Sequence, residues 1–164
     1  MTARVACFDI NPGWGSHTTI LAAELASLPP GALVIEHGAG VFSTPLIAQH
    51  DVRPWCIEDL IGWRGWARWV YASHGRDLRV EERAKPCVSS LPDASLVFID
   101  GIIQERGDLL RWALEAGVPT IIAHDTEDDY RKMYGYSERY FRFPGYTVTS
   151  DGSRPQTTVW RKCA

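Results

Sequence analysis

The sequence predicts a doubly wound α/β fold with a mostly parallel sheet. Three observations indicate this class: strand-like and helix-like segments alternate, the strand-like segments are apolar without alternation, and an antiparallel pair closes the chain. An apolar run without alternation is typical of a strand that is buried on both faces, as in a parallel sheet. No repeat or Gly/Ser-rich linker divides the sequence, so we expect residues 1–164 to form a single domain.

The first predicted element is a helix over residues 16–28, with Ser16 as its N-cap and a stop at Pro29-Pro30-Gly31. Its apolar residues share one face at helical spacing: Ile20, Leu21, Leu25 and Leu28. Five strands are then expected at 32–36, 53–58, 78–82 (a weak one), 95–100 and 119–124, with intervening helices at 43–49, 60–73 and 105–116. A hairpin with strands at 146–150 and 156–161 and a turn at 151–155 closes the fold.

The helix at 60–73 carries a row of tryptophans. Trp63, Trp66 and Trp69 recur at a spacing of three, and Val70 extends the row. We interpret this row mainly as core packing; the alternative is that one tryptophan lines a ligand site.

Composition excludes several classes of protein. With 45% hydrophobic and 23% charged residues, the chain is typical of a globular protein, and no apolar run approaches the roughly 20 residues of a membrane helix. The N-terminus lacks the pattern of a signal peptide, so we expect a cytoplasmic protein. A net charge of −3 without a basic stripe argues against nucleic-acid binding. The four cysteines lie too far apart in the sequence for a zinc signature.

Acidic residues follow four of the five parallel strands: Glu36, Glu58, Asp100 and Asp125. In an open α/β sheet, ligands bind at the carboxyl ends of the strands. Burying so many acids together is costly unless a ligand, a metal ion or water satisfies them. These residues therefore indicate the functional edge of the sheet.

The first of these ends leads into a glycine loop. Gly38 and Gly40 let the backbone turn tightly and approach a ligand closely, but Ser43 stands where a dinucleotide fingerprint has its third small residue. An acid such as Glu36 would repel a pyrophosphate and attract a cationic sulfonium. Glu58, 22 positions later, is placed to accept both hydroxyls of a ribose. The pattern favours S-adenosylmethionine over NAD; the alternative is that the glycines only make a turn.

At this point the sequence resembles a family, the class I S-adenosylmethionine-dependent methyltransferases. Val34-Ile-Glu-His-Gly-Ala-Gly40 is similar to their motif I and Cys56-Ile-Glu58 to their second motif. Leu96-Val-Phe-Ile-Asp-Gly101 and Ile121-Ile-Ala-His-Asp-Thr126 resemble the ends of strands four and five in the small O-methyltransferase branch. The resemblance covers residues 16–161 and implies a seven-stranded, Rossmann-like sheet with a C-terminal antiparallel hairpin.

The resemblance also implies roles for single residues. Glu36, Gly38, Gly40 and Ser43 would lie along the methionine and ribose of the cofactor, beside Asp100, and Glu58 would hold the ribose hydroxyls. Arg83 and Ala84 would lie near the adenine. His17 would cover the cofactor, or is only a residue of the first helical turn.

Methyl transfer needs an aligned nucleophile and often a base that takes its proton. Asp100, His124 and Asp125 are the candidate catalytic residues. Because side chains alternate along a strand, we expect only one of His124 and Asp125 to face the substrate, and we favour Asp125.

A metal site is a second possibility at the same place. In the catechol-type branch, acids at the ends of strands four and five hold Mg²⁺ with an amide neighbour. Asp100 and Asp125 match those acids, but Thr126 stands in place of the amide. A zinc site at His124 and Asp125 is disfavoured, since no partner His or Cys is spaced for it.

For the methyl acceptor, Arg106 is a candidate ligand of an anionic group, or simply a residue at the start of its helix. Tyr134 belongs to an aromatic cluster that would wall a substrate pocket or pack on the surface. We expect an enzyme that methylates a hydroxyl of a small molecule or glycan, with an open crevice or one completed by a second subunit. The alternatives are a nicotinamide-dependent oxidoreductase and a cofactor-binding domain without catalysis.

Overall fold

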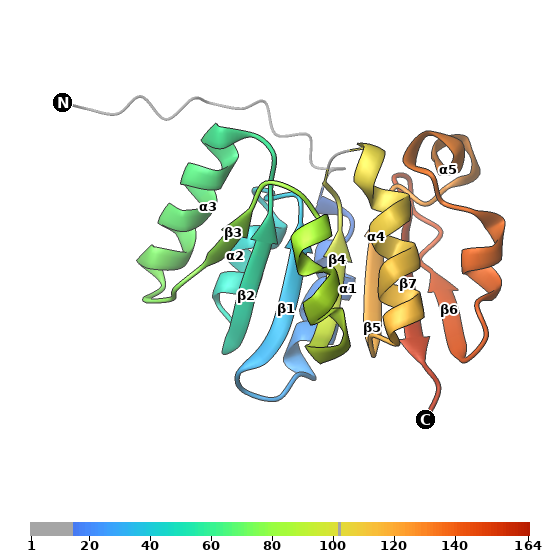
Figure 1. Ribbon diagram of the computed structural model, residues 1–164, viewed down its shortest axis with the longest axis horizontal. Helices are drawn as coiled ribbons and strands as arrows, with labels where there is room; N and C mark the ends of the chain where they lie inside the picture. Colours follow the sequence, from blue (N-terminus) through green and yellow to red (C-terminus); the bar gives the residue numbers. More distant parts are fainter. Residues whose placement is uncertain (1–14, 102) are drawn as a thin grey trace.

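The computed structural model describes residues 15–101 and 103–164, and it contains one seven-stranded sheet with the order β3-β2-β1-β4-β5-β7-β6 (Figure 1). The parallel strands are β1 (Ala32–His37), β2 (Val52–Ile57), β3 (Arg79–Glu81), β4 (Ala94–Ile99) and β5 (Thr120–His124). Strands β6 (Tyr146–Ser150) and β7 (Thr157–Lys162) form the hairpin, and β7 runs antiparallel to β5. The predicted fold class is therefore confirmed.

Helices cover both faces of the sheet. The segments α1 (Thr18–Ala26), α2 (Ser43–Ala48) and α3 (Ile61–Ser73) pack on one face, and α4 (Ile103–Ala116) and the 3₁₀ segment η2 (Lys85–Asp93) pack on the other (Figure 1). Two short segments, α5 (Asp128–Tyr134) and η3 (Glu138–Arg142), connect β5 to β6. No helix among the described residues is long and apolar enough to cross a membrane.

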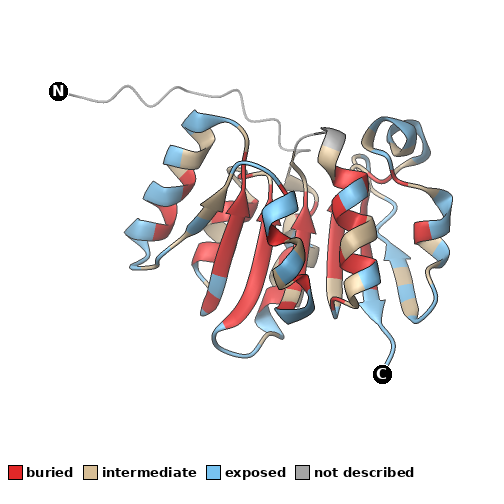
Figure 2. Ribbon diagram, viewed as in Figure 1, coloured by how far each residue is buried: buried red, intermediate tan, exposed pale blue. Residues whose placement is uncertain are grey.

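The core lies along the central strands, where buried residues run the length of β1, β2, β4 and β5 (Figure 2). All six residues of β1 are buried, as its unbroken apolar pattern predicts. On α4 the predicted inward residues are buried: Leu109, Leu110, Ala113 and Leu114.

The tryptophan row on α3 is only partly a core feature. Trp63 and Trp66 are half-buried and pack edge to face with ring centroids 5.2 Å apart, but Trp69 is 67% exposed. Three helical residues advance about 300°, so a spacing of three drifts around the helix by about 60° per step. The predicted stripe is therefore wrong for Trp69, and Ala67, Val70 and Tyr71 form the buried face instead.

The first helix is shorter than predicted. It begins at Thr18, with His17 as N-cap and no side-chain capping bond. Ser16, the predicted cap, directs its hydroxyl to His124 and to the carbonyl oxygen of Pro155. A residue that local patterning assigns to a helix end is thus part of the functional edge of the sheet.

Candidate functional site

The register of the sheet brings four predicted site residues to one level. His37 is paired with Ile57 of β2 and Ile99 of β4, and Ile99 is paired with Ala123 of β5. One position further along each strand are Gly38, Glu58, Asp100 and His124. The carboxyl ends of β2, β1, β4 and β5 therefore present one continuous row of polar groups.

The glycine loop touches the β4 end directly. Gly38 has φ +92°, and a Cβ atom there would lie 2.5 Å from Cα of Gly101 and 2.6 Å from the carbonyl oxygen of Asp100. Only glycine fits both the left-handed conformation and the contact between backbones. At Gly40, the amide donates to Oγ1 of Thr44, which ties the loop to the first turn of α2.

Glu36 does not line the crevice. Its side chain is enclosed between β1 and α2, 1% exposed, and Oε1 accepts hydrogen bonds from the hydroxyls of Ser43 (2.7 Å) and Thr44 (2.8 Å). Burial raises the pKa of Glu36 to about 8, despite these two donors. At neutral pH Glu36 is mainly protonated, so it cannot attract a sulfonium by charge as the sequence analysis expected. Glu36 instead holds Ser43 and Thr44 at the start of α2, and Thr44 in turn holds the amide of Gly40 in the glycine loop.

Glu58, in contrast, opens onto a cavity. Oε2 accepts from the amide of Ala39 (3.0 Å) and Oε1 from the amide of Leu60 (2.8 Å), which fixes the carboxylate at the end of β2. Burial raises its pKa above the ordinary value. The cavity beside it is small, about 10 Å³, and is lined by His37, Gly38, Ile57, Glu58, Asp59 and Glu82. A carboxylate held in this way still has lone pairs for two vicinal hydroxyls.

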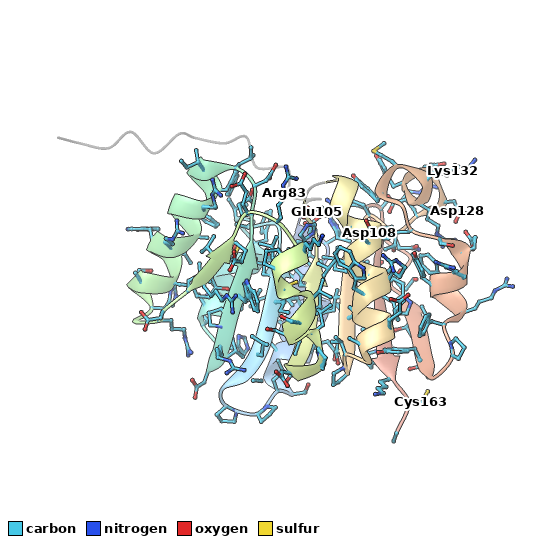
Figure 3. All side chains as sticks on the ribbon, in the orientation of Figure 1. Arg83, Glu105, Asp108, Asp128, Lys132 and Cys163 are labelled. Atoms are coloured by element: carbon cyan, nitrogen blue, oxygen red, sulfur yellow. The ribbon has the colours of Figure 1, made fainter. Side chains whose placement is uncertain are left out.

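Glu105 of α4 occupies the predicted adenine region. Its Oε2 accepts from the amide of Ala84 at 2.8 Å, and its Oε1 lies 3.7 Å from the guanidinium of Arg83, which is more than half exposed. Figure 3 shows Arg83 and Glu105 next to each other near the carboxyl ends of the strands. The amide of Ala84 is thus already bonded within the chain, and Arg83 is the freer of the two predicted adenine neighbours.

Arg106 is the centre of the β4–β5 end. It donates four hydrogen bonds: Nε to the carbonyl of Gly101, Nη1 to the carbonyl of His124 and to Oδ2 of Asp125 (3.0 Å), and Nη2 to the carbonyl of Asp100. Nη2 also forms an ion pair with Oδ1 of Asp100 at 3.0 Å. The side chain is 6% exposed. Because this buried guanidinium is engaged by two carboxylates, it holds the two predicted catalytic acids together. Its binding of an anionic substrate stays a prediction.

His124 and Asp125 both belong to the cluster around Asp100 and Arg106, although strand alternation would separate them; which of the two faces the substrate stays a prediction. Asp125 has φ +55°, which turns its side chain out of the strand pattern. As a result, Nδ1 of His124 lies 3.3 Å from Oδ1 of Asp100 and 3.6 Å from Oδ1 of Asp125. Burial alone would lower the pKa of His124, but the hydrogen bond and charge of Asp100 outweigh it and raise that pKa.

His17 completes the cluster from a distant part of the sequence. It is 2% exposed, and its ring lies 4.9 Å from that of His124 and 4.8 Å from that of Phe98, measured between centroids. Neither ring nitrogen has a hydrogen-bond partner among the described residues. Burial lowers its pKa to about 4, so His17 is neutral at physiological pH.

The predicted magnesium pair does not form the site expected from the sequence. The guanidinium of Arg106 lies between the carboxylates of Asp100 and Asp125, where the Mg²⁺ ion was expected. Thr126 is buried, and its hydroxyl is 2.6 Å from that of Thr158, away from the carboxylates. The charge that balances these acids therefore comes from a side chain.

Tyr134 lies against Arg106, whose guanidinium carbon is 4.1 Å from the ring centroid. The rings of Tyr130 and Tyr134 stack at 5.7 Å, and Tyr130 and Met133 are exposed on α5. The aromatic cluster thus supports the charged centre from one side and is open to solvent on the other.

Several solved structures share this architecture. A precorrin-6Y C5,15-methyltransferase from Geobacter metallireducens has a TM-score of 0.68 at 15% sequence identity, over 90% of this chain and 87% of that chain. A precorrin-8W decarboxylase from Methanobacterium thermoautotrophicum has a TM-score of 0.63 at 16% identity, over 89% and 90%. The E81Q mutant of MtNAS in complex with S-adenosylmethionine has a TM-score of 0.62 at 13% identity, over 93% of this chain and 63% of that chain.

No protein-family model and no curated protein sequence matches the chain. At identities of this size, the structural similarity establishes the fold. The strand order, the antiparallel β7 and the glycine turn after β1 agree with it. The chain has the Rossmann-like fold of the class I S-adenosylmethionine-dependent methyltransferases.

Proposed function

We propose that the chain is an S-adenosylmethionine-dependent methyltransferase. The observation that carries this proposal is the pairing of two features on one level of the sheet. The Gly38 turn and the fixed Glu58 carboxylate border a cavity at the ends of β1 and β2. Beside them, β4 and β5 end in a cluster of ionisable side chains that could take a proton from a methyl acceptor.

The cofactor would lie along the first half of this row. Glu58 would accept the ribose hydroxyls, and the backbone from Gly38 to Gly40 would face the methionine part. This assignment differs from the sequence-based one in a physical respect: Glu36 supplies no negative charge, so the sulfonium is balanced from the β4–β5 side, where Asp100 and Asp125 are only partly exposed. MtNAS, which shares the fold, is recorded with S-adenosylmethionine bound.

We assign the acceptor atom to a hydroxyl of a small molecule or glycan. In the reaction, the hydroxyl oxygen bonds to the methyl carbon, the carbon–sulfur bond breaks with its electrons remaining on sulfur, and S-adenosylhomocysteine leaves. The hydroxyl proton must pass to a base. Asp125 is suited to this, because Arg106 holds its Oδ2 while the side chain stays 18% exposed beside the open aromatic surface of α5.

The first test is binding. S-adenosylhomocysteine at millimolar concentration should raise the melting temperature, because a ligand that binds only the folded state stabilises it. NADH under the same conditions should leave it unchanged. Absence of a shift with S-adenosylhomocysteine would contradict the cofactor assignment, and a shift with NADH alone would favour an oxidoreductase.

The second test is turnover against a panel of phenols, catechols and sugars, measured as S-adenosylhomocysteine formed. Asp125→Asn should lower turnover by about 10²–10⁴-fold, the contribution of a general base, while cofactor affinity is retained. Asp129→Asn, on the exposed face of α5, is the matched control and should behave as wild type. Loss of cofactor binding in Asp125→Asn would instead place Asp125 in the cofactor site.

A further inference from the structure

Three potential metal ligands from distant segments meet at the carboxyl edge of the sheet. His17 precedes α1, Asp100 follows β4, and His124 ends β5, and one ligand atom of each lies within 4.8 Å of the others. The sequence alone disfavours zinc here, because no partner His or Cys is spaced near His124. The fold supplies that partner, more than a hundred positions earlier in the chain.

The contacts of Ser16 favour one tautomer of His124. Ser16 donates its only proton to the carbonyl oxygen of Pro155 at 3.1 Å, because a carbonyl can only accept. Oγ of Ser16 is 3.0 Å from Nε2 of His124, so both contacts are hydrogen bonds only if Nε2 carries a proton and donates. A metal-bound histidine commonly donates its second ring nitrogen in this way.

The other nitrogen, Nδ1, therefore faces Asp100 across 3.3 Å. A bare nitrogen lone pair and a carboxylate repel each other at this distance, so a cation must lie between them: a proton or a metal ion. Among the described residues, the two side-chain contacts of Asp100, with Arg106 and His124, fall on Oδ1, and Oδ2 is able to accept a further ligand.

His17 separates these two alternatives. A proton between His124 and Asp100 would give His17 no role, and both of its ring nitrogens would stay buried without a partner. Burying an unpaired polar group in this way destabilises the folded protein. A metal ion at this place would use one of those nitrogens and remove part of the penalty.

We propose that His17, Asp100 and His124 bind a divalent transition-metal ion. Two imidazoles and one carboxylate suit zinc or iron(II) rather than magnesium, which prefers oxygen ligands. Three protein ligands leave at least one coordination position for water or for an oxygen of the acceptor. The site is argued from its own side chains and does not depend on the identity of the cofactor.

The direct test uses the metal-free protein and Co²⁺ as a visible probe, followed by Zn²⁺ in equilibrium dialysis. We expect one equivalent to bind and a d–d absorption band to appear. His17→Phe and His124→Phe should each weaken binding by more than the about 10–100-fold that loss of an outer-sphere partner costs. His50→Phe is the control, since His50 lies outside the cluster and bonds to the carbonyl of Leu46.

His17→Phe also distinguishes a structural role of His17 from a role in metal binding. Phenylalanine preserves the ring contact with Phe98 and removes the unpartnered nitrogens, so in EDTA this variant should unfold at a higher temperature than wild type. Added Zn²⁺ should then stabilise wild type and leave His17→Phe unchanged. Equal metal affinity in wild type and His17→Phe, or less than one equivalent in wild type, would overturn the proposal.

The same samples separate this inference from the proposed function. S-adenosylhomocysteine binding is measured by calorimetry with EDTA and with Zn²⁺. If the protein binds one equivalent of metal but no S-adenosylhomocysteine, the metal site is supported and the proposed methyltransferase function is contradicted. If it binds S-adenosylhomocysteine but no metal, the proposed function is supported and the metal site is contradicted.

Discussion

The two halves of the functional edge satisfy their acids in opposite ways. At the ends of β1 and β2, Glu36 and Glu58 are held by hydroxyls and backbone amides, and burial raises both of their pKa values. At the ends of β4 and β5, Asp100 is held by Arg106 and His124; burial would raise its pKa, but these partners lower it. The first half thus holds its acids with uncharged hydrogen-bond donors, and the second half holds them with charged partners.

This difference assigns different chemistry to each half. Carboxyl groups held by uncharged donors are suited to accept hydrogen bonds from the hydroxyls of a sugar. Fixed opposite charges are suited to a reaction in which charge moves. Substitutions in each half test this contrast, and the largest loss of stability is expected at Arg106.

Removing Arg106 should damage the charged half severely. Arg106→Met leaves Asp100 and Asp125 facing each other without a cation, and breaking such a pair costs about 3 kcal/mol of unfolding free energy, at the lower end for buried pairs because both acids are partly exposed. Urea unfolding measures this. Arg111→Met, on the outer face of the same helix, should cost less than about 1 kcal/mol. Equal losses in the two variants would contradict a charged centre organised by Arg106.

Glu36→Gln, in the half formed by β1 and β2, should change how the stability of the protein depends on pH. The folded protein keeps Glu36 protonated up to about pH 8, while the unfolded chain releases the proton near pH 4.5. Between these values the unfolded state binds fewer protons, so stability falls as pH rises, by up to about 1.4 kcal/mol per pH unit.

Glutamine has no such proton to lose. Glu36→Gln should therefore match wild type near pH 4 and become progressively more stable than wild type toward pH 8, as measured by urea unfolding across this range. Parallel curves for the two proteins would show that Glu36 is ionised in the folded state.

A smaller effect is expected from Glu58→Gln. One charged acceptor is lost, and a hydrogen bond to a charged group contributes about 1.5–3 kcal/mol, so S-adenosylhomocysteine should bind at least about 10-fold more weakly in calorimetry. Glu115→Gln, exposed on α4, is the control. An affinity unchanged in Glu58→Gln would move the ribose away from the end of β2.

Much of the fold could be predicted because its signals are local. The buried strands have continuous apolar runs, and most predicted ends differ from the observed ones by one or two residues. The segments η2, α5 and η3 were missed: η2 contains Pro86 and Pro92 and follows no helical period, and the other two are short.

The site was predicted in its positions but less well in its contacts. Strand ends located Glu58, Asp100 and His124 correctly on one level of the sheet. The roles of His17 and Ser16 depend on a contact with β5 across more than a hundred residues, which no local pattern reports. The left-handed turn at Asp125 had a weak signal, since aspartate adopts this conformation more readily than most residues.

The backbone contact between Gly38 and Gly101 fixes where new specificity can arise. Because main chain meets main chain there, the floor beneath both ligands cannot widen without separating β1 from β4. Related chains that accept bulkier molecules must therefore gain space on the side of the ligands that faces away from the sheet. Among the described residues, α5 borders the β4–β5 half of the edge through Tyr134, and its exposed Tyr130 and Met133 can be exchanged without disturbing the sheet.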